Sequence, residues 1–597
     1  MENNDSKPFW RYVKAQQQDS VGVSPLKICG RLYSDAASKA SALNRQFQSV
    51  FTAPQQPGDN IPKLSGVKTP SIQPIEISNN GVEKLLSRLN VKKASGPDSI
   101  CCRILKELSA ELAPVLTNIY TQSIATGSIP NEWSTAFVSP IFKKGSRNLP
   151  ENYRPVSLTS VPSKILEHII CSHVRRHLDA HCVLTDFQHG FRGGHSCESQ
   201  LLVTLGDLLY WRDRKVQVDV AVLDFAKAFD TVPHQSLLGK LEHYGIDGPL
   251  HGWIKAFLTG RTQCVLVDGV KSDFVPVNSG VPQGTVLGPL LFLLHINDLP
   301  QSVSSSVRLF ADDCLLYKTI RSFDDTLALQ RDLHALELWG SRWGMRFNVK
   351  KCNILRISSS KKPITVRYTL GGEILQEVDQ AKYLGITITS ELGWSEHVDS
   401  ISNRANSTLG FLRRNLRHSP KGIKELAYFS LVRSKLEYSA SIWDPHKRKD
   451  IDKLERVQRR AARFVCNDSS YRSSVTSMIR DLGWQELASR RRDIRLALFY
   501  KVVHHLVAVP TEDILVEADS RTRASHRFKY RTIRTNCDPY KNSFFPRTIA
   551  DWNSLPSDTV EAPSVDSFKN KLLPATQQAP SAASLGLAQP WLVHNCQ

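Results

Sequence analysis

Three aspartates stand where apolar segments end, a placement suited to metal-assisted phosphoryl transfer. Asp312 and Asp313 follow an apolar stretch, 309–311, and precede another, 315–317. Apolar residues on both sides predict a short hairpin with the two carboxylates at its tip. Because adjacent side chains of a strand point to opposite faces, at most one of this pair can face a given centre. Asp224 ends a second apolar run. Two strand-borne carboxylates are what a two-metal phosphoryl-transfer site requires.

A segment rich in glycine and proline, 278–290, lies between the two acidic segments. Glycine allows another backbone or a ligand to approach closely. Gln283 is the polar side chain at the place where such a backbone or ligand would approach. We expect a rigid turn that opens into an apolar helix over 285–296.

These segments, in this order, resemble the motifs of reverse transcriptases from non-LTR retrotransposons of the LINE type, including jockey-like clades. Residues 310–313 resemble the catalytic box, 224–230 the first palm motif, and 279–289 the motif that holds the template base pair. Further matching segments are 94–98, 140–145, 152–158, 188–192, 347–352 and 383–386. The resemblance covers most of residues 80–400.

The resemblance implies an α+β fold arranged as a right-hand polymerase. Its parts would be fingers and palm over 76–390, divided near residue 215, a helical basic thumb over 391–505, and a C-terminal extension over 506–573. We expect residues 1–75 to be an N-terminal linker remnant with a helix at 36–51. Residues 574–597, rich in Ala, Gln, Pro and Ser, predict a disordered tail.

The resemblance also assigns the metal site and the proton donor. Mg²⁺, for which Mn²⁺ may substitute, prefers hard oxygen ligands. Its expected ligands are the carboxylates of Asp224, Asp312 and Asp313 and the backbone carbonyl of Phe225. Lys351 resembles the lysine proposed as general acid for pyrophosphate release. A surface lysine at the start of a strand is the alternative.

The remaining site residues would bind the nucleotide. Arg154 and Lys143 (or its neighbour 144) would grip the triphosphate, because guanidinium and ammonium groups bind phosphate. Phe229 would lie under the sugar and exclude a 2′-hydroxyl; the alternative is a core phenylalanine. Gln283 and Gly284 would contact the nascent base pair. Arg192 would contact the template strand, and Asp230 would fix a turn.

The chain is strongly basic, with a formal net charge of +20 and a pI near 9.4. This excess favours a polyanionic partner, because release of phosphate counterions supplies affinity. A local concentration of arginine falls in the expected thumb, where aromatic residues are interleaved with Arg459, Arg460, Arg463 and the run 490–492. We interpret this region as a surface that grips a nucleic-acid duplex. Ordinary solvated helix faces are the alternative.

Cysteine usage and hydropathy narrow the class of protein further. Twelve cysteines without regular spacing indicate neither a zinc site nor a disulfide framework, and favour reduced thiols in an intracellular protein. No long apolar run, signal peptide or amphipathic anchor favours a membrane. We therefore expect no membrane partner. Priming at target DNA, which the resemblance implies, predicts a nuclear site of action.

The predicted function is RNA-directed DNA synthesis, with an RNA template, a DNA primer or target and dNTPs as partners. Two alternatives remain: a catalytically dead or domesticated nucleic-acid-binding relic, and another palm polymerase such as a group II intron maturase or an RNA-dependent RNA polymerase. The box at 310–313 and Phe229 favour the LINE type. Residues 1–75 are too short for the endonuclease domain of full-length relatives, so we expect the endonuclease to be supplied by a partner.

Overall fold

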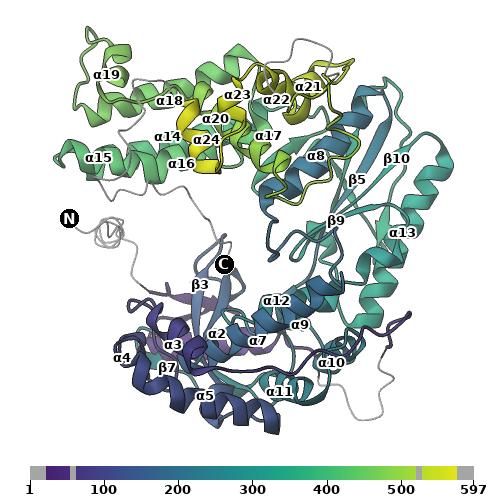
Figure 1. Cartoon of the computed structure of the whole chain (residues 1–597), viewed down its shortest axis with the longest axis vertical. Helices are drawn as coiled ribbons and strands as arrows, with labels where there is room; N and C mark the ends of the chain where they lie inside the picture. The colour runs from purple at the N-terminus through teal and green to yellow at the C-terminus, as the bar shows by residue number, and fades with distance from the viewer. Residues whose placement is uncertain (1–21, 54–61, 519–527, 574–597) are drawn as a thin grey trace.

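The computed structural model describes residues 22–53, 62–518 and 528–573 (Figure 1). Its main sheet has five strands in the order β14–β11–β5–β10–β9. The strands pair antiparallel except for β11 and β14, which are parallel. In chain order their bounds are β5 Gln217–Asp224, β9 Ser306–Phe310, β10 Asp313–Ile320, β11 Asn353–Ile357 and β14 Gln376–Val378.

The main sheet is buried on both faces, because each face packs against a hydrophobic core. Alternate residues such as Val220, Leu315 and Leu355 face one hydrophobic core, which also holds α8 and the C-terminal helices. Their neighbours, such as Leu223 and Leu316, face a second core built from the helices of the N-terminal half. The sheet therefore joins the two halves of the molecule.

A smaller sheet lies in the N-terminal half, in the order β4–β3–β6–β7, with β8 also paired to β6. Its bounds are β3 Thr135–Phe142, β4 Tyr153–Leu158, β6 Thr262–Val267, β7 Val270–Lys271 and β8 Val275–Pro276. Residue 135 of β3 pairs with residue 262 of β6 in parallel register, so segments far apart in sequence form one sheet.

Residues 22–53 differ from the expected linker. They form a hairpin, β1 Leu26–Ile28 and β2 Arg31–Tyr33, followed by helix α2 Ala36–Gln48. Leu43 and Phe47 of α2 pack with Val265 of the small sheet in a third core. Lys39 reinforces this packing by donating to the Val23 carbonyl at 2.8 Å. This segment is an integral part of the fold, because its apolar face is buried against the sheet.

The other helices of the N-terminal half surround the two sheets. Helix α12 is apolar on all sides and is buried. Helix α13 begins with a capping box at Ser322 and ends at Gly344 in the left-handed region. The helices are α3 Asn79–Ser87, α4 Cys102–Glu107, α5 Ser109–Thr126, α6 Asn131–Ser134, α7 Val161–Ala180, α8 Cys197–Asp213, α9 Ala228–Thr231, α10 His234–His243, α11 Gly248–Leu258, α12 Gly288–Ile296 and α13 Phe323–Trp343.

Two short hairpins lead from the main sheet into a helical C-terminal half. The hairpins are β12 Thr369–Leu370 with β13 Glu373–Ile374, and β15 Gln380–Tyr383 with β16 Ile386–Thr389. Figure 1 shows this half in green and yellow at the top, above the purple and blue N-terminal elements. Its helices are α14 Ser395–Asn415, α15 Lys421–Tyr428, α16 Ser434–Glu437, α17 Ala440–Trp443, α18 Arg448–Val465, α19 Val475–Asp481, α20 Leu487–Val503, α21 Asp538–Lys541, α22 Phe544–Asn553, α23 Ser557–Val560 and α24 Val565–Leu572.

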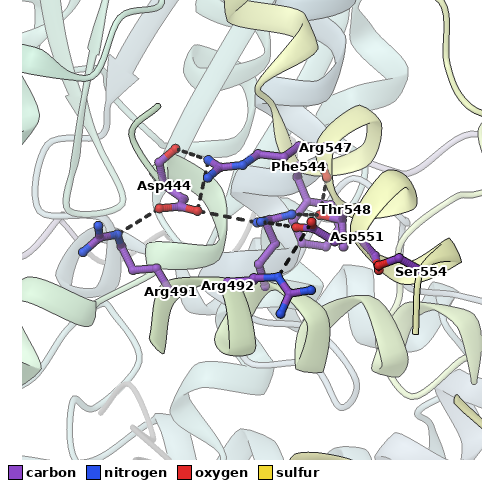
Figure 2. A network of polar contacts seen from close by, with 9 residues as sticks. Asp444, Arg491, Arg492, Phe544, Arg547, Thr548, Asp551 and Ser554 are labelled. Atoms are coloured by element: carbon purple, nitrogen blue, oxygen red, sulfur yellow. Dashed lines mark hydrogen bonds and ion pairs between the residues drawn. The ribbon is translucent and has the colours of Figure 1, made fainter. Parts of the chain in front are cut away.

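A buried ionic network ties α20 to the residues after 528 (Figure 2). Asp444, in the loop between α17 and α18, receives a hydrogen bond from Arg491 at 2.9 Å and lies 3.1 Å from Arg547 of α22. Arg495 bonds Asp551 of α22 at 2.7 Å. Figure 2 shows these side chains converging between the helices. The C-terminal helices are therefore held to the preceding helices by charge as well as by apolar packing.

This network corrects part of the interpretation of the basic region. Arg491 is about 1% exposed, so it cannot grip a duplex, and Arg490 pairs with Glu437 of α16. The interleaved aromatics Trp484 and Tyr500 are also buried in the core. Sequence spacing could not show that these side chains point inward, because their partners lie far away in the chain.

No helix among the described residues is long and apolar enough to cross a membrane. The predicted disordered tail, residues 574–597, lies outside the described residues.

Candidate active site

The three aspartates meet at one edge of the main sheet. Strand β5 ends at Asp224, and β10 begins at Asp313, which pairs with Asp224 in register. Asp312 lies in the tight turn between β9 and β10, where Ala311 adopts a left-handed conformation with φ of +52°. The predicted hairpin with carboxylates at its tip is confirmed.

The proximity of the carboxylates changes their acidity. Desolvation, together with the negative charges of Asp312 and Asp224, raises the pKa of Asp313 to about 6. Burial also raises the pKa of Asp312, and the charge of Asp224 adds to this effect. A cation at this edge would relieve the repulsion between these groups.

The donor set suits a hard divalent cation. Carboxylate oxygens are the ligands that Mg²⁺ prefers, and substrate phosphates and water complete its shell. Within the described ranges, no group of three or more His, Cys, Asp or Glu side chains forms a ready-made metal cage. The carboxylates of the acidic edge are the type of ligand that Mg²⁺ prefers.

The backbone around Asp224 is fixed by the segment before β11. The Asn348 N–H donates to the Asp224 carbonyl at 2.7 Å, and Phe225 forms a bridge with Phe347. The rings of Phe225 and Phe347 stack with centroids 4.3 Å apart. Lys351, on the short helix η3 Val349–Lys351, donates to Asp224 Oδ2 at 2.7 Å. The predicted general acid thus lies directly beside a predicted metal ligand.

Two cations of the small sheet act on the same edge. Arg154 lies in β4, opposite residue 141 of β3, and Lys143 follows the end of β3. Desolvation lowers the pKa of Lys143, and the positive charges of Arg154 and Lys351 lower it further, while Asp312 opposes them. The charges of Lys143 and Arg154 therefore interact with the carboxylates of the acidic edge.

Phe229 and the turn at 278–288 lie beside one another. Phe229 stacks on Phe292 of α12 with ring centroids 4.3 Å apart, and its carbonyl accepts the Val281 N–H at 2.8 Å. It is half-buried and lines a small pocket with Gln283. The geometry is therefore compatible with packing and with contact to a ligand.

The turn itself approaches β4 closely. The Gln283 carbonyl accepts the Ser157 N–H at 2.7 Å. Gly284 has a φ of +105°, and a Cβ on it would lie 2.6 Å from the Ser157 carbonyl oxygen. Only glycine fits this position without displacing β4.

Asp230 holds the side chain of Gln283. The Gln283 amide Nε2 donates to Asp230 Oδ1 at 3.0 Å. Burial raises the pKa of Asp230 to about 6, although the charge of Lys227 and the hydrogen bond from Gln283 oppose this rise. Asp230 thus links the first acidic segment to the turn.

Gln188 is a site-positioning residue that sequence reasoning did not single out. Its Oε1 accepts the N–H groups of Ala311 at 2.9 Å and Gly190 at 2.7 Å. The His189 N–H donates to the Leu309 carbonyl at 3.0 Å. A Cβ on Gly190 would lie 2.3 Å from the Ala311 nitrogen. Residues 188–190 therefore hold the turn that carries Asp312 in place. The sequence indicated these residues only because segment 188–192 resembles a motif of the family.

Arg192 supports its own loop. It donates to the carbonyls of Thr185 at 2.6 Å and Gln188 at 3.3 Å. It also lies 3.7 Å from Asp186. The assigned contact with a template strand remains a prediction.

The three arginines of α18 differ in their surroundings. Arg459 is exposed, Arg460 donates to Asn406 of α14 at 3.0 Å, and Arg463 donates to the Ser470 and Ser473 carbonyls. Arg460 also lines a polar groove of about 230 Å³ between α14 and α18. Helix α18, which carries these residues, lies in the upper half of Figure 1.

Comparisons with known proteins agree with this geometry. Residues 141–388 match the family model described as "Reverse transcriptase (RNA-dependent DNA polymerase)". The chain is 29% identical over 497 residues to the probable RNA-directed DNA polymerase from transposon BS of Drosophila melanogaster, covering 79% of this chain and 54% of that protein.

Two further relatives come from the same species. The RNA-directed DNA polymerase from mobile element jockey is 28% identical over 464 residues, which cover 75% of this chain and 50% of that protein. The probable RNA-directed DNA polymerase from transposon X-element is 29% identical over 394 residues, which cover 64% of this chain and 43% of that protein. The chain spans about half the length of these curated relatives.

Proposed function

We propose that this chain, whose residues 141–388 are a reverse transcriptase domain related to those of non-LTR retrotransposons, copies an RNA template into DNA. The observation that carries the proposal is the cross-strand pairing of Asp224 with Asp313 at the edge where Asp312 also lies. Its substrates would be dNTPs, a DNA primer or target DNA, and the RNA of its own element.

The acidic edge would hold the metal ions. Asp224, Asp312 and Asp313, with the Phe225 carbonyl, would bind two Mg²⁺ ions, for which Mn²⁺ can substitute. When bound, such ions activate the primer 3′-hydroxyl and stabilise the charge of the in-line transition state. Clamping of the Asp312 turn by Gln188 keeps the carboxylates in position before substrate arrives.

Cationic side chains would orient the triphosphate and its leaving group. Lys143 and Arg154, whose charges act on Asp312 of the acidic edge, would bind the phosphate oxygens. Lys351, 2.7 Å from Asp224, would give a proton to the departing pyrophosphate. These roles follow from positive charge next to the site of phosphoryl transfer.

The nucleotide would be selected by Phe229 and the neighbouring turn. Phe229 would stand under the sugar and clash with a 2′-hydroxyl, while Gln283 and Gly284 would lie against the nascent base pair. The close approach of Gly284 to β4 fixes the turn against the small sheet, and Gln283 and Phe229 line the same small pocket.

The elements would divide as in a right-hand polymerase. Residues 76–215 would form the fingers, 216–390 the palm, 391–505 the thumb and 506–573 a C-terminal extension. Arg459, Arg460 and Arg463 would lie on the thumb surface that holds the duplex, and Arg192 would contact the template. Action on chromosomal target DNA would place the protein in the nucleus. An endonuclease partner would supply the nick.

Primer extension tests the proposed activity. Purified protein with Mg²⁺ and dNTPs should extend a labelled DNA primer on an RNA template. Asp312→Asn should abolish extension while leaving binding to the primer–template largely intact. Binding without extension by the unchanged protein would favour the nucleic-acid-binding relic instead.

A further inference from the structure

The backbone of the turn that carries Gln283 is fixed from two sides. The Gln283 carbonyl accepts the Ser157 N–H of β4 at 2.7 Å. Further along, the carboxylate of Glu167, fully buried in α7, accepts the N–H groups of Val286 at 2.7 Å and Leu287 at 3.1 Å. Neither anchor touches the Gln283 side chain. The path of the turn is therefore set independently of that side chain.

One contact sets the orientation of the Gln283 amide. Its Nε2 donates to Asp230 Oδ1 at 3.0 Å, and among the described residues the amide has no other hydrogen-bond partner. The backbone of Asp230 is itself fixed, because its N–H donates to the Lys227 carbonyl at 2.9 Å and its carbonyl accepts from Ser279 Oγ at 2.8 Å. The carboxyl group of Asp230 thus approaches Gln283 from a rigid support.

The hydrogen-bonding chemistry of Asp230 and Gln283 determines which end of the Gln283 amide points away from Asp230. An ionised carboxylate only accepts hydrogen bonds, so it must face the amide nitrogen. The amide oxygen then points away from Asp230 and is free to accept a hydrogen bond. Asp230, Gln283 and Phe229 line the same pocket, so this acceptor lies next to the residue assigned to the sugar.

We propose that Asp230 is a positioning residue that acts through Gln283: its carboxylate holds the amide so that the amide oxygen accepts from the incoming nucleotide. Asp230 itself does not touch the nucleotide. The inference rests on the proposed polymerase function and deepens it, because it assigns the polarity of the group that recognises the nucleotide.

Substitution of Asp230 by Asn should release this orientation. An asparagine amide can face Gln283 with either its oxygen or its nitrogen, so both orientations of the Gln283 amide become accessible. The backbone anchors at Ser157 and Glu167 are unaffected. We expect Asp230→Asn to raise the KM for dNTP about tenfold, the equivalent of one hydrogen bond, with a smaller change in kcat.

A double-mutant cycle in primer extension separates this role from a general structural one. We would measure kcat and KM for the unchanged protein, D230N, Q283A and D230N/Q283A. If Asp230 acts through Gln283, D230N raises KM only when Gln283 is present. An equal effect of D230N in both backgrounds would overturn the inference.

A charge-swapped pair tests the same polarity without relying on D230N alone. Q283E places two carboxylates face to face and should impair extension. D230N/Q283E restores a donor–acceptor pair and still presents a carboxylate oxygen outward, so it should recover much of the lost kcat/KM. A double variant impaired as much as the product of the two single effects would contradict the proposal.

The matched control is Asp332→Asn. Asp332 is a buried carboxylate of α13 that accepts from Ser304 and Ser305, so its substitution disturbs a buried carboxylate that has no contact with the Gln283 turn. It should leave the KM for dNTP unchanged. An unchanged protein that fails to extend any primer would refute the proposed function, whereas an active protein without coupling between Asp230 and Gln283 would refute only this inference.

Discussion

Phe229 illustrates how a single side chain can serve both packing and selection. One face of its ring stacks on Phe292, and the residue as a whole remains half-buried. We expect Phe229→Val to admit ribonucleotides, because a smaller side chain removes the clash with a 2′-hydroxyl. The ratio of kcat/KM for dNTP to that for rNTP should fall by at least about tenfold, or about 1.4 kcal/mol.

The measurement is single-nucleotide extension with each nucleotide in turn. Phe191→Val is the matched control, because the Phe191 ring packs nearly perpendicular to the Phe229 ring, with the two centroids 6.2 Å apart. That variant should change the ratio much less. An unchanged ratio in Phe229→Val would make Phe229 a core residue only.

A second prediction for a single residue concerns how the contribution of Asp313 to folding stability depends on pH. Its pKa in the folded protein is about 6, raised from 3.8. Between these values the folded state binds more protons than the unfolded chain, so this carboxyl makes folding less favourable as pH rises from about 4 to 6. Asp313→Asn removes the effect. In metal-free buffer, Tm of this variant minus Tm of the unchanged protein should therefore increase from pH 4.5 to pH 7.5.

Thermal melts at several pH values measure this difference. Asp324→Asn, at an exposed aspartate in the first turn of α13, is the control for the same substitution outside the carboxylate cluster. Mg²⁺ should raise Tm more at pH 7.5 than at pH 5.0, because its ligands must be deprotonated. A pH-independent difference for Asp313→Asn would contradict the coupling of the carboxylates.

Sequence reasoning could identify Asp224 and Asp312 because an acidic residue at the end of an apolar strand is a local pattern. It could not identify the residues that hold them. Gln188 bonds the backbone of Ala311, and Glu167 bonds the backbone of Leu287, each across more than a hundred residues. Such contacts join a side chain to a distant backbone and leave no periodic trace in the sequence.

At the scale of elements, the network around Asp444 holds the C-terminal helices in place. Asp444 faces three arginines, of which Arg491 and Arg495 are almost fully buried. Asp444→Ala should destabilise the protein by about 3–5 kcal/mol, because it leaves buried charges without their partner. Urea denaturation measures this loss.

The control for that variant is Asp452→Ala. Asp452 pairs with Arg448 at 3.0 Å on the exposed surface of α18. Exposed pairs contribute about 0–1 kcal/mol, so the control should change the free energy of unfolding little. Equal effects of the two variants would show that the buried network does not hold these helices.

Helix α18 carries the prediction about nucleic-acid binding. Replacing Arg459 and Arg460 by Gln should flatten the dependence of log K on log salt, by roughly 0.9 per lost phosphate contact on B-form duplex. The change should be similar for all duplex sequences, because phosphate contacts carry no sequence information. Lys84→Gln on the exposed side of α3 is the control.

Fluorescence anisotropy at several salt concentrations measures this slope. Arg463 is left unchanged here, because it already braces residues 470 and 473. An unaltered slope in the double variant would make these arginines ordinary solvated residues.

The observed bounds of the elements show where local sequence patterns are sufficient to predict secondary structure. The apolar helix predicted over 285–296 ends at the predicted residue, Ile296, but it begins at Gly288 rather than at residue 285. The later start arises because Thr285 caps the turn, accepting the Gly288 N–H on its hydroxyl. The inward orientation of Arg491 depended on tertiary partners that no local pattern reveals.

At the scale of the whole molecule, the two halves meet on opposite faces of one sheet. A hydrophobic core lies on each face of the main sheet. Residues 22–53 were harder to place, because the core that covers α2 comes from strands more than a hundred residues away. The resemblance implied the α+β class but not which segments share a core.

The most direct test of the account is single-turnover extension of a DNA primer on an RNA template with Mg²⁺. Three proteins are compared: the unchanged chain, Asp312→Asn and the matched buried variant Asp332→Asn. We predict extension by the first and third, and a loss on the order of 10³-fold for Asp312→Asn at equal primer–template binding, because a metal-held transition state contributes several kcal/mol. Extension by Asp312→Asn at the rate of the unchanged chain would contradict the assignment of the active site.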